Sequence, residues 1–185
     1  MIMVLSIVIG PMYSGKSSYL INEINNSYKN NENILVINHK IDIRYNKDKI
    51  TNHNNISTDC ISFTNLKEIF DYVKKNSLLI EKLNHIYIDE AQFFTDLEDV
   101  VSNLLNTFPN LKITCVGLDG DFQQKVFNDG QLLKLIAKAE NVIKLSSKCY
   151  ICGEKAFFTK RTTNDTSQIL VGSNNLYVPS CYIHK

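Results

Sequence analysis

The sequence predicts an α/β fold: a parallel β-sheet with helices on both faces, followed by a small C-terminal domain. Short apolar strands alternate with helical segments along most of the chain, and a glycine-rich motif directly follows the first strand. Alternation of this kind is typical of a parallel sheet that is buried on both sides. Near Lys148 the composition changes to Cys, Gly, Thr and Asn with little periodicity. We therefore expect a main domain at 1–147 and a smaller domain at 148–185.

The expected elements follow one another in a regular order. Apolar runs are interpreted as strands, and segments with apolar residues at helical spacing as helices. Asn65 with Glu68, and Thr95 with Glu98, fit the capping-box pattern of a helix start. The polar segment 46–55 is interpreted as a loop. The expected strands are 4–9, 34–38, 85–89, 112–118 and 142–145, and the expected helices are 16–28, 65–75, 95–107 and 130–139.

Composition and charge exclude several classes of protein. The chain has 185 residues, of which 44% are hydrophobic, and a formal net charge of +1. Without a basic run, the charge gives no electrostatic footprint for nucleic acid. The N-terminal apolar run stops at Gly10 and has no basic residues before it, so we expect neither a signal peptide nor a membrane span. We expect a soluble, cytoplasmic protein that binds neither nucleic acid nor membrane.

The glycine-rich motif GPMYSGKS at 10–17 fits the pattern G-x-x-x-x-G-K-[ST] between a strand and a helix. Backbone N–H groups of such a loop wrap a phosphate at the helix N-terminus. Lys16 would reach the β- and γ-phosphates, and the Ser17 hydroxyl would bind Mg²⁺. A Gly-Pro turn with a chance lysine is the alternative, which the flanking elements disfavour. The motif predicts a sheet of the P-loop NTPase type with a nucleotide site.

Two carboxylates stand at the end of the strand expected at 85–89. Asp89 fits the residue that holds Mg²⁺, directly or through water, at the carboxyl end of a strand. For Glu90 two roles stay open: polarising a water for ATP hydrolysis, or removing a proton from an acceptor hydroxyl. Two solvated carboxylates opening a loop are the alternative, disfavoured by the motif at Gly10.

Four potential metal ligands lie near the C-terminus. Cys149-x-x-Cys152 and Cys181-x-x-His184 have spacings that suit tetrahedral Zn²⁺. Four protein ligands leave no position for water, so a structural zinc is favoured over a catalytic one. Separate thiols with a surface histidine are the alternative, and disulfides are disfavoured without a signal peptide. Cys115, in an expected strand, is predicted to pack as a small apolar side chain.

The ordered motifs GPMYSGKSS, DIRY, IDEAQFF, LDGDFQQKVF and FTKR, with the two zinc-type pairs, resemble thymidine kinases of the cellular and poxvirus type. The resemblance covers 10–184. It implies a P-loop α/β domain, a small zinc domain with a lasso loop over the nucleoside, and transfer of the γ-phosphoryl of ATP to the 5′-hydroxyl of thymidine, and of deoxyuridine. His184 stands where many members have cysteine, and Asn54 follows His53 where an acidic residue is common.

The same resemblance assigns roles to individual residues. Glu90 is expected to be the general base on the 5′-hydroxyl, with Lys16 and Arg44 acting on the transferring phosphoryl. The expected ATP and Mg²⁺ site comprises Gly10, Pro11, Met12, Tyr13, Ser14, Gly15, Lys16, Ser17, Asp42, Ile43, Arg44, Asp89, Glu90, Ala91 and Gln92. The expected nucleoside site comprises Met12, Phe93, Leu118, Phe122, Phe127, Thr159, Gln168, Ile169, Leu170, Val171, Gly172 and Tyr177.

The lasso expected from the resemblance spans 159–177. Main-chain groups of 168–172 would hold the thymine base, with Met12 and Thr159 near its 5-methyl group. Thymine presents an acceptor–donor–acceptor edge that extended backbone can complement. Cytosine would leave two buried mismatches, each costing about 1–3 kcal/mol.

The resemblance also implies partners: ATP with Mg²⁺, thymidine, a structural Zn²⁺, dTTP as a feedback inhibitor, and a homotetramer. Three alternatives stay open. A DEAD-box-like helicase would need a second motor domain and a basic channel, which this length and charge do not supply. A catalytically idle nucleotide-binding or zinc interaction module would not phosphorylate thymidine. A kinase for another nucleoside, such as deoxyuridine alone or a purine, would phosphorylate a different substrate.

Overall fold

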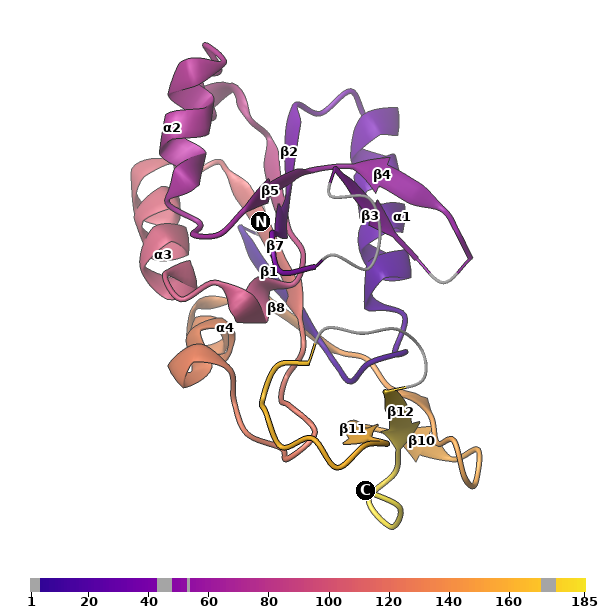
Figure 1. The fold of residues 1–185 in the computed structure, drawn as a ribbon. Coiled ribbons are helices and arrows are strands. Elements are labelled where there is room, and N and C mark those ends of the chain that lie inside the picture. Colours follow the sequence, from indigo (N-terminus) through magenta and orange to yellow (C-terminus); the bar gives the residue numbers. More distant parts are fainter. Residues whose placement is uncertain (1–3, 43–47, 53, 171–175) are drawn as a thin grey trace.

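The computed structural model describes residues 4–42, 48–52, 54–170 and 176–185. Its centre is a six-stranded sheet in the order β5-β2-β6-β7-β1-β8, and every strand pair in that sheet is parallel. Helix α1 covers one face, and α2, α3 and α4 cover the other (Figure 1). The predicted α/β fold is therefore confirmed.

The strands of the main sheet are β1 Leu5–Ile9, β2 Ile34–His39, β5 Ile61–Phe63, β6 His85–Ile88, β7 Lys112–Gly117 and β8 Asn141–Lys144. The helices are α1 Lys16–Lys29, α2 Glu68–Lys75, α3 Leu97–Thr107 and α4 Gln131–Lys134. Short 3₁₀ turns lie at Ile80–Lys82, Ala91–Phe93, Asn128–Gly130 and Leu135–Lys138. Three antiparallel pairs complete the described part: β3 Lys49–Thr51 with β4 Ser57–Asp59, β9 Ser147–Lys148 with β10 Lys155–Ala156, and β11 Phe158–Arg161 with β12 Tyr177–Ser180.

The two faces of the sheet bury different side chains, because successive residues of a strand point to opposite sides. In β1, Ile7 and Ile9 pack with α2, α3 and α4, whereas Val8 packs against Leu20 and Ile24 of α1. Cys115 of β7 belongs to the first of these cores and is fully buried, and burial raises the pKa of its thiol to about 12. The prediction that Cys115 packs as an apolar side chain is confirmed.

The helix starts differ in part from the predicted capping boxes. Glu68 accepts a hydrogen bond from the Asn65 N–H at 2.8 Å, as a capping box requires, but α2 begins only at Glu68 and no side chain caps it. The Thr95–Glu98 box is wrong, since α3 begins at Leu97 without a side-chain cap. Asp96 instead accepts the N–H groups of two residues that precede α2, so its carboxylate ties the starts of the two helices together.

Two further differences concern the polar segment and the last helix. The segment 46–55, interpreted as a loop, contains β3, and β5 forms an edge of the main sheet that the sequence did not predict. The helix expected at 130–139 is α4 followed by a 3₁₀ turn. Among the described residues, no helix is long and apolar enough to cross a bilayer.

Candidate active site

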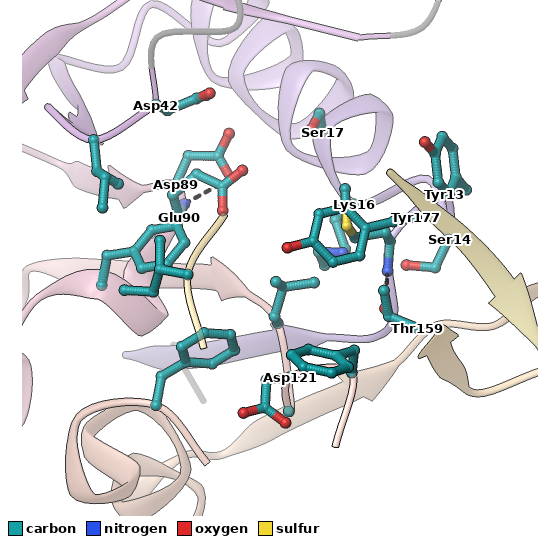
Figure 2. A pocket seen from close by; sticks show the side chains of 18 of the residues that line it. Tyr13, Ser14, Lys16, Ser17, Asp42, Asp89, Glu90, Asp121, Thr159 and Tyr177 are labelled. Atoms are coloured by element: carbon teal, nitrogen blue, oxygen red, sulfur yellow. Dashed lines mark hydrogen bonds between the residues drawn. The ribbon is translucent and has the colours of Figure 1, made fainter. Parts of the chain in front are cut away.

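The carboxyl ends of β1, β6 and β7 lie at one edge of the sheet, because all three strands are parallel and adjacent in the order β6-β7-β1. A cavity of about 330 Å³ opens at this edge (Figure 2). Its wall on the far side comes from β11, β12 and the segment between them. The lining residues are Met12, Tyr13, Ser14, Gly15, Lys16, Ser17, Ser18, Ile41, Asp42, Asn52, Asp89, Glu90, Phe93, Leu118, Gly120, Asp121, Phe122, Phe127, Thr159, Gln168, Ile169, Leu170 and Tyr177.

The loop after β1 wraps the N-terminus of α1. Gly15 has φ 86°, a left-handed conformation that favours glycine, and it places the first turn of α1 toward the cavity. A Cβ on Gly10 would lie 2.7 Å from the Leu145 carbonyl oxygen, so the close packing of the loop also requires glycine there. Lys16 Nζ donates to the carbonyl oxygens of Gly10 and Pro11, at 3.0 and 2.7 Å. The loop thus presents a cation and helix N–H groups at the cavity.

A tight turn after β6 carries the two carboxylates. Asp89 is buried and accepts the Glu90 N–H at 3.0 Å, while Glu90 has a left-handed backbone with φ 48°. Gln92 Nε2 donates to Glu90 Oε2 at 2.6 Å, and Gln92 Oε1 accepts the Leu118 N–H at 2.9 Å. Gln92, which is 2% exposed, therefore fixes the Glu90 carboxylate relative to the end of β7.

The space that Gln92 occupies depends on Gly117. A Cβ at Gly117 would lie 2.4 Å from Gln92 Oε1 and 2.8 Å from Leu132 Cδ2. Asn128 Nδ2 donates to the Gln92 and Phe93 carbonyl oxygens at 3.0 and 2.8 Å. The turn after β6 is thus fixed by contacts with Leu118, Asn128 and the space left by Gly117.

Aromatic rings form the floor beside Glu90. Phe93 lies edge to face with Phe127, with ring centroids 5.6 Å apart, and His39 packs edge to face on Phe94 at 4.7 Å. The Ile41 N–H donates to His39 Nδ1, so His39 Nε2 carries the proton and donates to the Thr64 carbonyl. Burial lowers the pKa of His39 and agrees with this neutral form.

Strand β11 and the segment that follows it contact residues before Ser147 at two points. Thr159 Oγ1 accepts the Met12 N–H at 3.0 Å, which joins the glycine-rich loop to β11. Gln168 Nε2 donates to Asp121 Oδ2 at 2.9 Å and to the Val126 carbonyl at 3.0 Å. These contacts close the cavity over the carboxyl ends of the strands.

The structure brings most of the sequence-predicted site residues to this one cavity. Gly10 and Pro11, the first residues of the loop, and the buried Ala91 and Gln92 do not line it. Ile43, Arg44, Val171, Gly172 and His53 lie outside the described residues.

Sequence reasoning missed five lining residues and one neighbour. Ser18, Ile41, Asn52, Gly120 and Asp121 line the cavity, and Arg161 lies beside it. Asn52 Nδ2 donates to Ser18 Oγ at 3.2 Å, which places the β3–β4 hairpin over the start of α1. Asp121 and Arg161 stand within the quoted motifs LDGDFQQKVF and FTKR, which is the signal that could have found them.

The four predicted metal ligands meet at the far end of the C-terminal hairpins. Cys149, Cys152, Cys181 and His184 offer ligand atoms that all lie within 4.8 Å of one another. Cys152 Sγ and Cys181 Sγ are 3.8 Å apart, and Cys149 Sγ lies 3.6 Å from His184 Nδ1. A tetrahedron with Zn–S about 2.3 Å and Zn–N about 2.0–2.1 Å has edges of about 3.8 and 3.6 Å.

The chemistry of the donors also fits zinc. Backbone hydrogen bonds to the Cys149 sulfur, first from Cys152 and then from Cys181 and Ile151, lower the pKa of the Cys149 thiol to about 5. A thiolate is the ligating form. The residues present therefore fit a structural Zn²⁺ with three cysteines and one histidine.

Comparisons with known proteins agree with these features. The profile of the thymidine kinase family matches residues 3–184. The chain is 35% identical over 179 residues to "Thymidine kinase a" of Arabidopsis thaliana, covering 96% of this chain and 73% of that protein. It is 32% identical to "Thymidine kinase" of Oryza sativa subsp. japonica, covering 96% of this chain and 64% of that protein.

A viral relative matches over nearly its full length. "Thymidine kinase" of Amsacta moorei entomopoxvirus is 35% identical over 187 residues, covering 97% of this chain and 96% of that protein. A solved structure, domain III of the Thermotoga maritima replication initiation protein DnaA, aligns with a TM-score of 0.43 and 18% identity over 77% of this chain and 55% of that one, a likeness too weak to bear on function. The family match and the relatives confirm the resemblance inferred from the motifs, and the chain belongs to the thymidine kinase family of ATP-dependent phosphotransferases.

Proposed function

We propose that this kinase transfers the γ-phosphoryl of ATP to the 5′-hydroxyl of thymidine, with Glu90 as the general base. The observation that carries the proposal is the position of Glu90: its carboxylate faces the same cavity as Lys16 and the lasso side chains. Gln92 holds that carboxylate at 2.6 Å. A fixed carboxylate next to a phosphate loop suits proton removal from a bound hydroxyl, and positioned bases contribute about 10²–10⁴-fold to a rate. Of the two roles left open for Glu90, we therefore favour the base.

The phosphate side of the site follows from the glycine-rich loop. Helix N–H groups and Lys16 would hold the β- and γ-phosphates, and the Lys16 ammonium would turn from its carbonyl acceptors toward them. Ser17 and Asp89, with Asp42 nearby, supply the oxygen ligands that Mg²⁺ prefers. Bound there, Mg²⁺ would neutralise charge on the transferring phosphoryl. We propose Arg44 as a further cation at this point.

The nucleoside side is proposed from the lasso. Main-chain groups at 168–172 would pair with the thymine edge, and the rings of Phe93, Phe122 and Phe127 would enclose the nucleoside. Thymidine and deoxyuridine present the same hydrogen-bonding edge, so we propose that both are accepted. Deoxycytidine leaves mismatched groups in a closed site and is rejected by about 10²-fold or more.

The homotetramer and inhibition by dTTP are proposed on the family likeness alone. The boundary between residues 147 and 148 is proposed from the change of composition near Lys148, and the cytoplasmic location from the lack of a signal-peptide pattern in the sequence. The zinc is proposed to be structural, since four protein ligands would fill the four positions of tetrahedral Zn²⁺ and leave none for water.

The test is phosphorylation of a panel of nucleosides with ATP and Mg²⁺, for the wild-type protein and for Glu90→Gln. We expect activity with thymidine and deoxyuridine, and a kcat about 10²–10⁴-fold lower in the variant with ATP binding retained. Glu81→Gln, at an exposed 3₁₀ turn, is the matched control. Near-normal turnover by Glu90→Gln would remove Glu90 from the role of base, and efficient deoxycytidine phosphorylation would refute the main-chain recognition of the base.

A further inference from the structure

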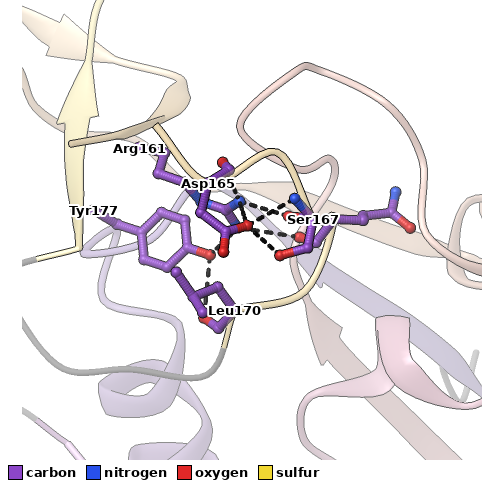
Figure 3. A network of polar contacts seen from close by, with 6 residues as sticks. Arg161, Asp165, Ser167, Leu170 and Tyr177 are labelled. Atoms are coloured by element: carbon purple, nitrogen blue, oxygen red, sulfur yellow. Dashed lines mark hydrogen bonds and ion pairs between the residues drawn. The ribbon is translucent and has the colours of Figure 1, made fainter. Parts of the chain in front are cut away.

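Arg161 at the end of β11 is a buried cation whose contacts all go to the lasso or its neighbours. Its side chain is 1% exposed. The antiparallel register places Arg161 opposite Tyr177 of β12, so both residues face the root of the lasso (Figure 3). Buried arginines need several hydrogen-bond acceptors to offset the loss of water.

The guanidinium finds these acceptors along the lasso backbone. Arg161 Nη1 donates to the carbonyl oxygens of Asp165 and Ser167 at 2.9 and 2.5 Å, and Nη2 lies 3.4 Å from the Gln168 carbonyl. Nη2 also donates to the Tyr177 hydroxyl, which in turn donates to the Leu170 carbonyl at 3.1 Å. One planar group therefore contacts the chain, directly or through Tyr177, at four points between 165 and 170.

The same guanidinium is held by a ring of the main domain. Arg161 Cζ lies 3.9 Å from the centroid of the Phe122 ring, a cation–π distance. Phe122 lines the cavity and follows Asp121, which accepts from the Gln168 side chain. The lasso is thus tied to the segment 121–122 twice, through Arg161 and through Gln168.

The arrangement is better suited to positioning than to stabilising the fold. The paired carboxylate, Asp165, lies 3.5 Å away and its side chain is 44% exposed, so it compensates little of the buried charge. Arg161 Nε has no hydrogen-bond partner in the described part of the chain. Yet the lasso residues 162–169 are exposed, and they have no apolar core to hold them in one conformation.

We propose that Arg161 is a positioning residue for nucleoside recognition: its guanidinium fixes the main chain of 165–170 in the conformation that reads the base. Arginine is required because a planar fork can serve several carbonyls at once while stacking on Phe122, and an ammonium cannot. This inference rests on the proposed role of the lasso in binding thymidine.

The test compares Arg161→Lys with Lys160→Gln, an exposed neighbour on the same strand. We expect Arg161→Lys to raise the KM for thymidine about tenfold or more while the KM for ATP is unchanged and kcat stays within about threefold. Backbone hydrogen exchange in 162–170 should accelerate in Arg161→Lys and not in Lys160→Gln, with zinc content unchanged in both. Gln168→Ala removes the hydrogen bond from the lasso to Asp121. It should also raise the KM for thymidine and accelerate exchange in 162–170.

Two results would overturn the proposal. Unchanged exchange in 162–170 would show that Arg161 does not order the lasso, and equal increases of both KM values or a loss of zinc would indicate a general structural role. The exchange measurement needs no activity. If the wild-type protein fails to phosphorylate thymidine, the proposed function falls, while the exchange comparison still decides whether Arg161 positions the lasso.

Discussion

Gln92 holds the carboxylate of Glu90, the proposed base, in place. Replacing Gln92 should show how much of the rate depends on the position of that carboxylate. Gln92→Met keeps the length and volume of the side chain but removes both polar atoms. Two hydrogen bonds are lost, one to the Glu90 carboxylate at 2.6 Å and one from the Leu118 N–H at 2.9 Å. The Leu118 N–H then loses its acceptor at a partly buried site, which costs up to about 1–3 kcal/mol, and the bond to a charged group is worth about 1.5–3 kcal/mol.

Water in the cavity can replace part of the bond to Glu90, so we expect the free energy of unfolding to fall by about 2–4 kcal/mol. The effect on rate has a different origin. A carboxylate that shifts by about 1 Å from its position near the acceptor hydroxyl can cost about 10²-fold. We therefore expect kcat to fall about 10–100-fold, less than in Glu90→Gln, with little change in the KM for ATP.

The assay is steady-state kinetics with thymidine and ATP, together with urea unfolding of the same preparations. Gln131→Met on α4 is the matched control, because the Gln131 side chain accepts the Glu98 N–H at 3.1 Å away from the cavity. That variant should lose stability and keep its kcat. The positioning argument is wrong if Gln92→Met keeps a kcat within about twofold of wild type. It is also wrong if the kcat of Gln131→Met falls as far as that of Gln92→Met.

The remaining predictions concern the phosphate loop, the zinc cluster and pH. Lys16→Ala should abolish transfer at saturating ATP without unfolding the protein, because it removes the contact to the β- and γ-phosphates; normal activity would refute the P-loop assignment. Cys152→Ser should lower zinc content below one equivalent and weaken thymidine binding more than ATP binding in separate titrations, whereas Cys60→Ser, outside the cluster, should do neither. Burial, with Lys112 adding to it, lowers the pKa of His85 from 6.5 to about 4. Between these values the unfolded chain binds the proton and the folded one does not, so the free energy of unfolding should fall as pH drops from 6.5 to 4, by on the order of 3 kcal/mol. His85→Gln should reduce that slope in urea titrations, and an unchanged slope would contradict the assignment.

The main sheet could be predicted from sequence because its strands are buried on both faces. Runs such as Leu5–Ile9 and 34–37 are apolar at nearly every position, and this signal does not depend on tertiary partners. The edge strand Ile61–Phe63 and the hairpin of β3 and β4 were missed because three-residue strands next to polar loops carry almost no period. Pairing in the fold, rather than intrinsic preference, makes them strands.

The candidate site likewise contains residues that sequence motifs predict and residues that only the fold brings together. GPMYSGKS and IDEAQFF are continuous motifs, so sequence alone placed the glycine-rich loop and both carboxylates at one site, and they line one cavity in the structure. Gln168 and Asp121 meet across 47 positions, and Met12 and Thr159 across 147. No local pattern encodes such pairs. Arg161 was quoted in FTKR without a role, because a buried arginine looks like an exposed one in sequence.

In the proposed function, the C-terminal part joins a metal site to the loop that recognises the base. Antiparallel β11 and β12 begin and end beside each other, with Phe158 opposite Ser180 at the end near the zinc ligands and Arg161 opposite Tyr177 at the lasso end. Cys181 directly follows β12, and Tyr150 N–H donates to the Pro179 carbonyl at 2.9 Å, so a zinc ion bound by the four ligands would hold both strands at this end. A clamp at one end and the guanidinium at the other leave the hairpin little freedom to twist. The exposed residues 162–169 could then keep a defined backbone without a core of their own, since closing the ends of the lasso costs roughly 3 kcal/mol and a structural zinc would contribute more than that.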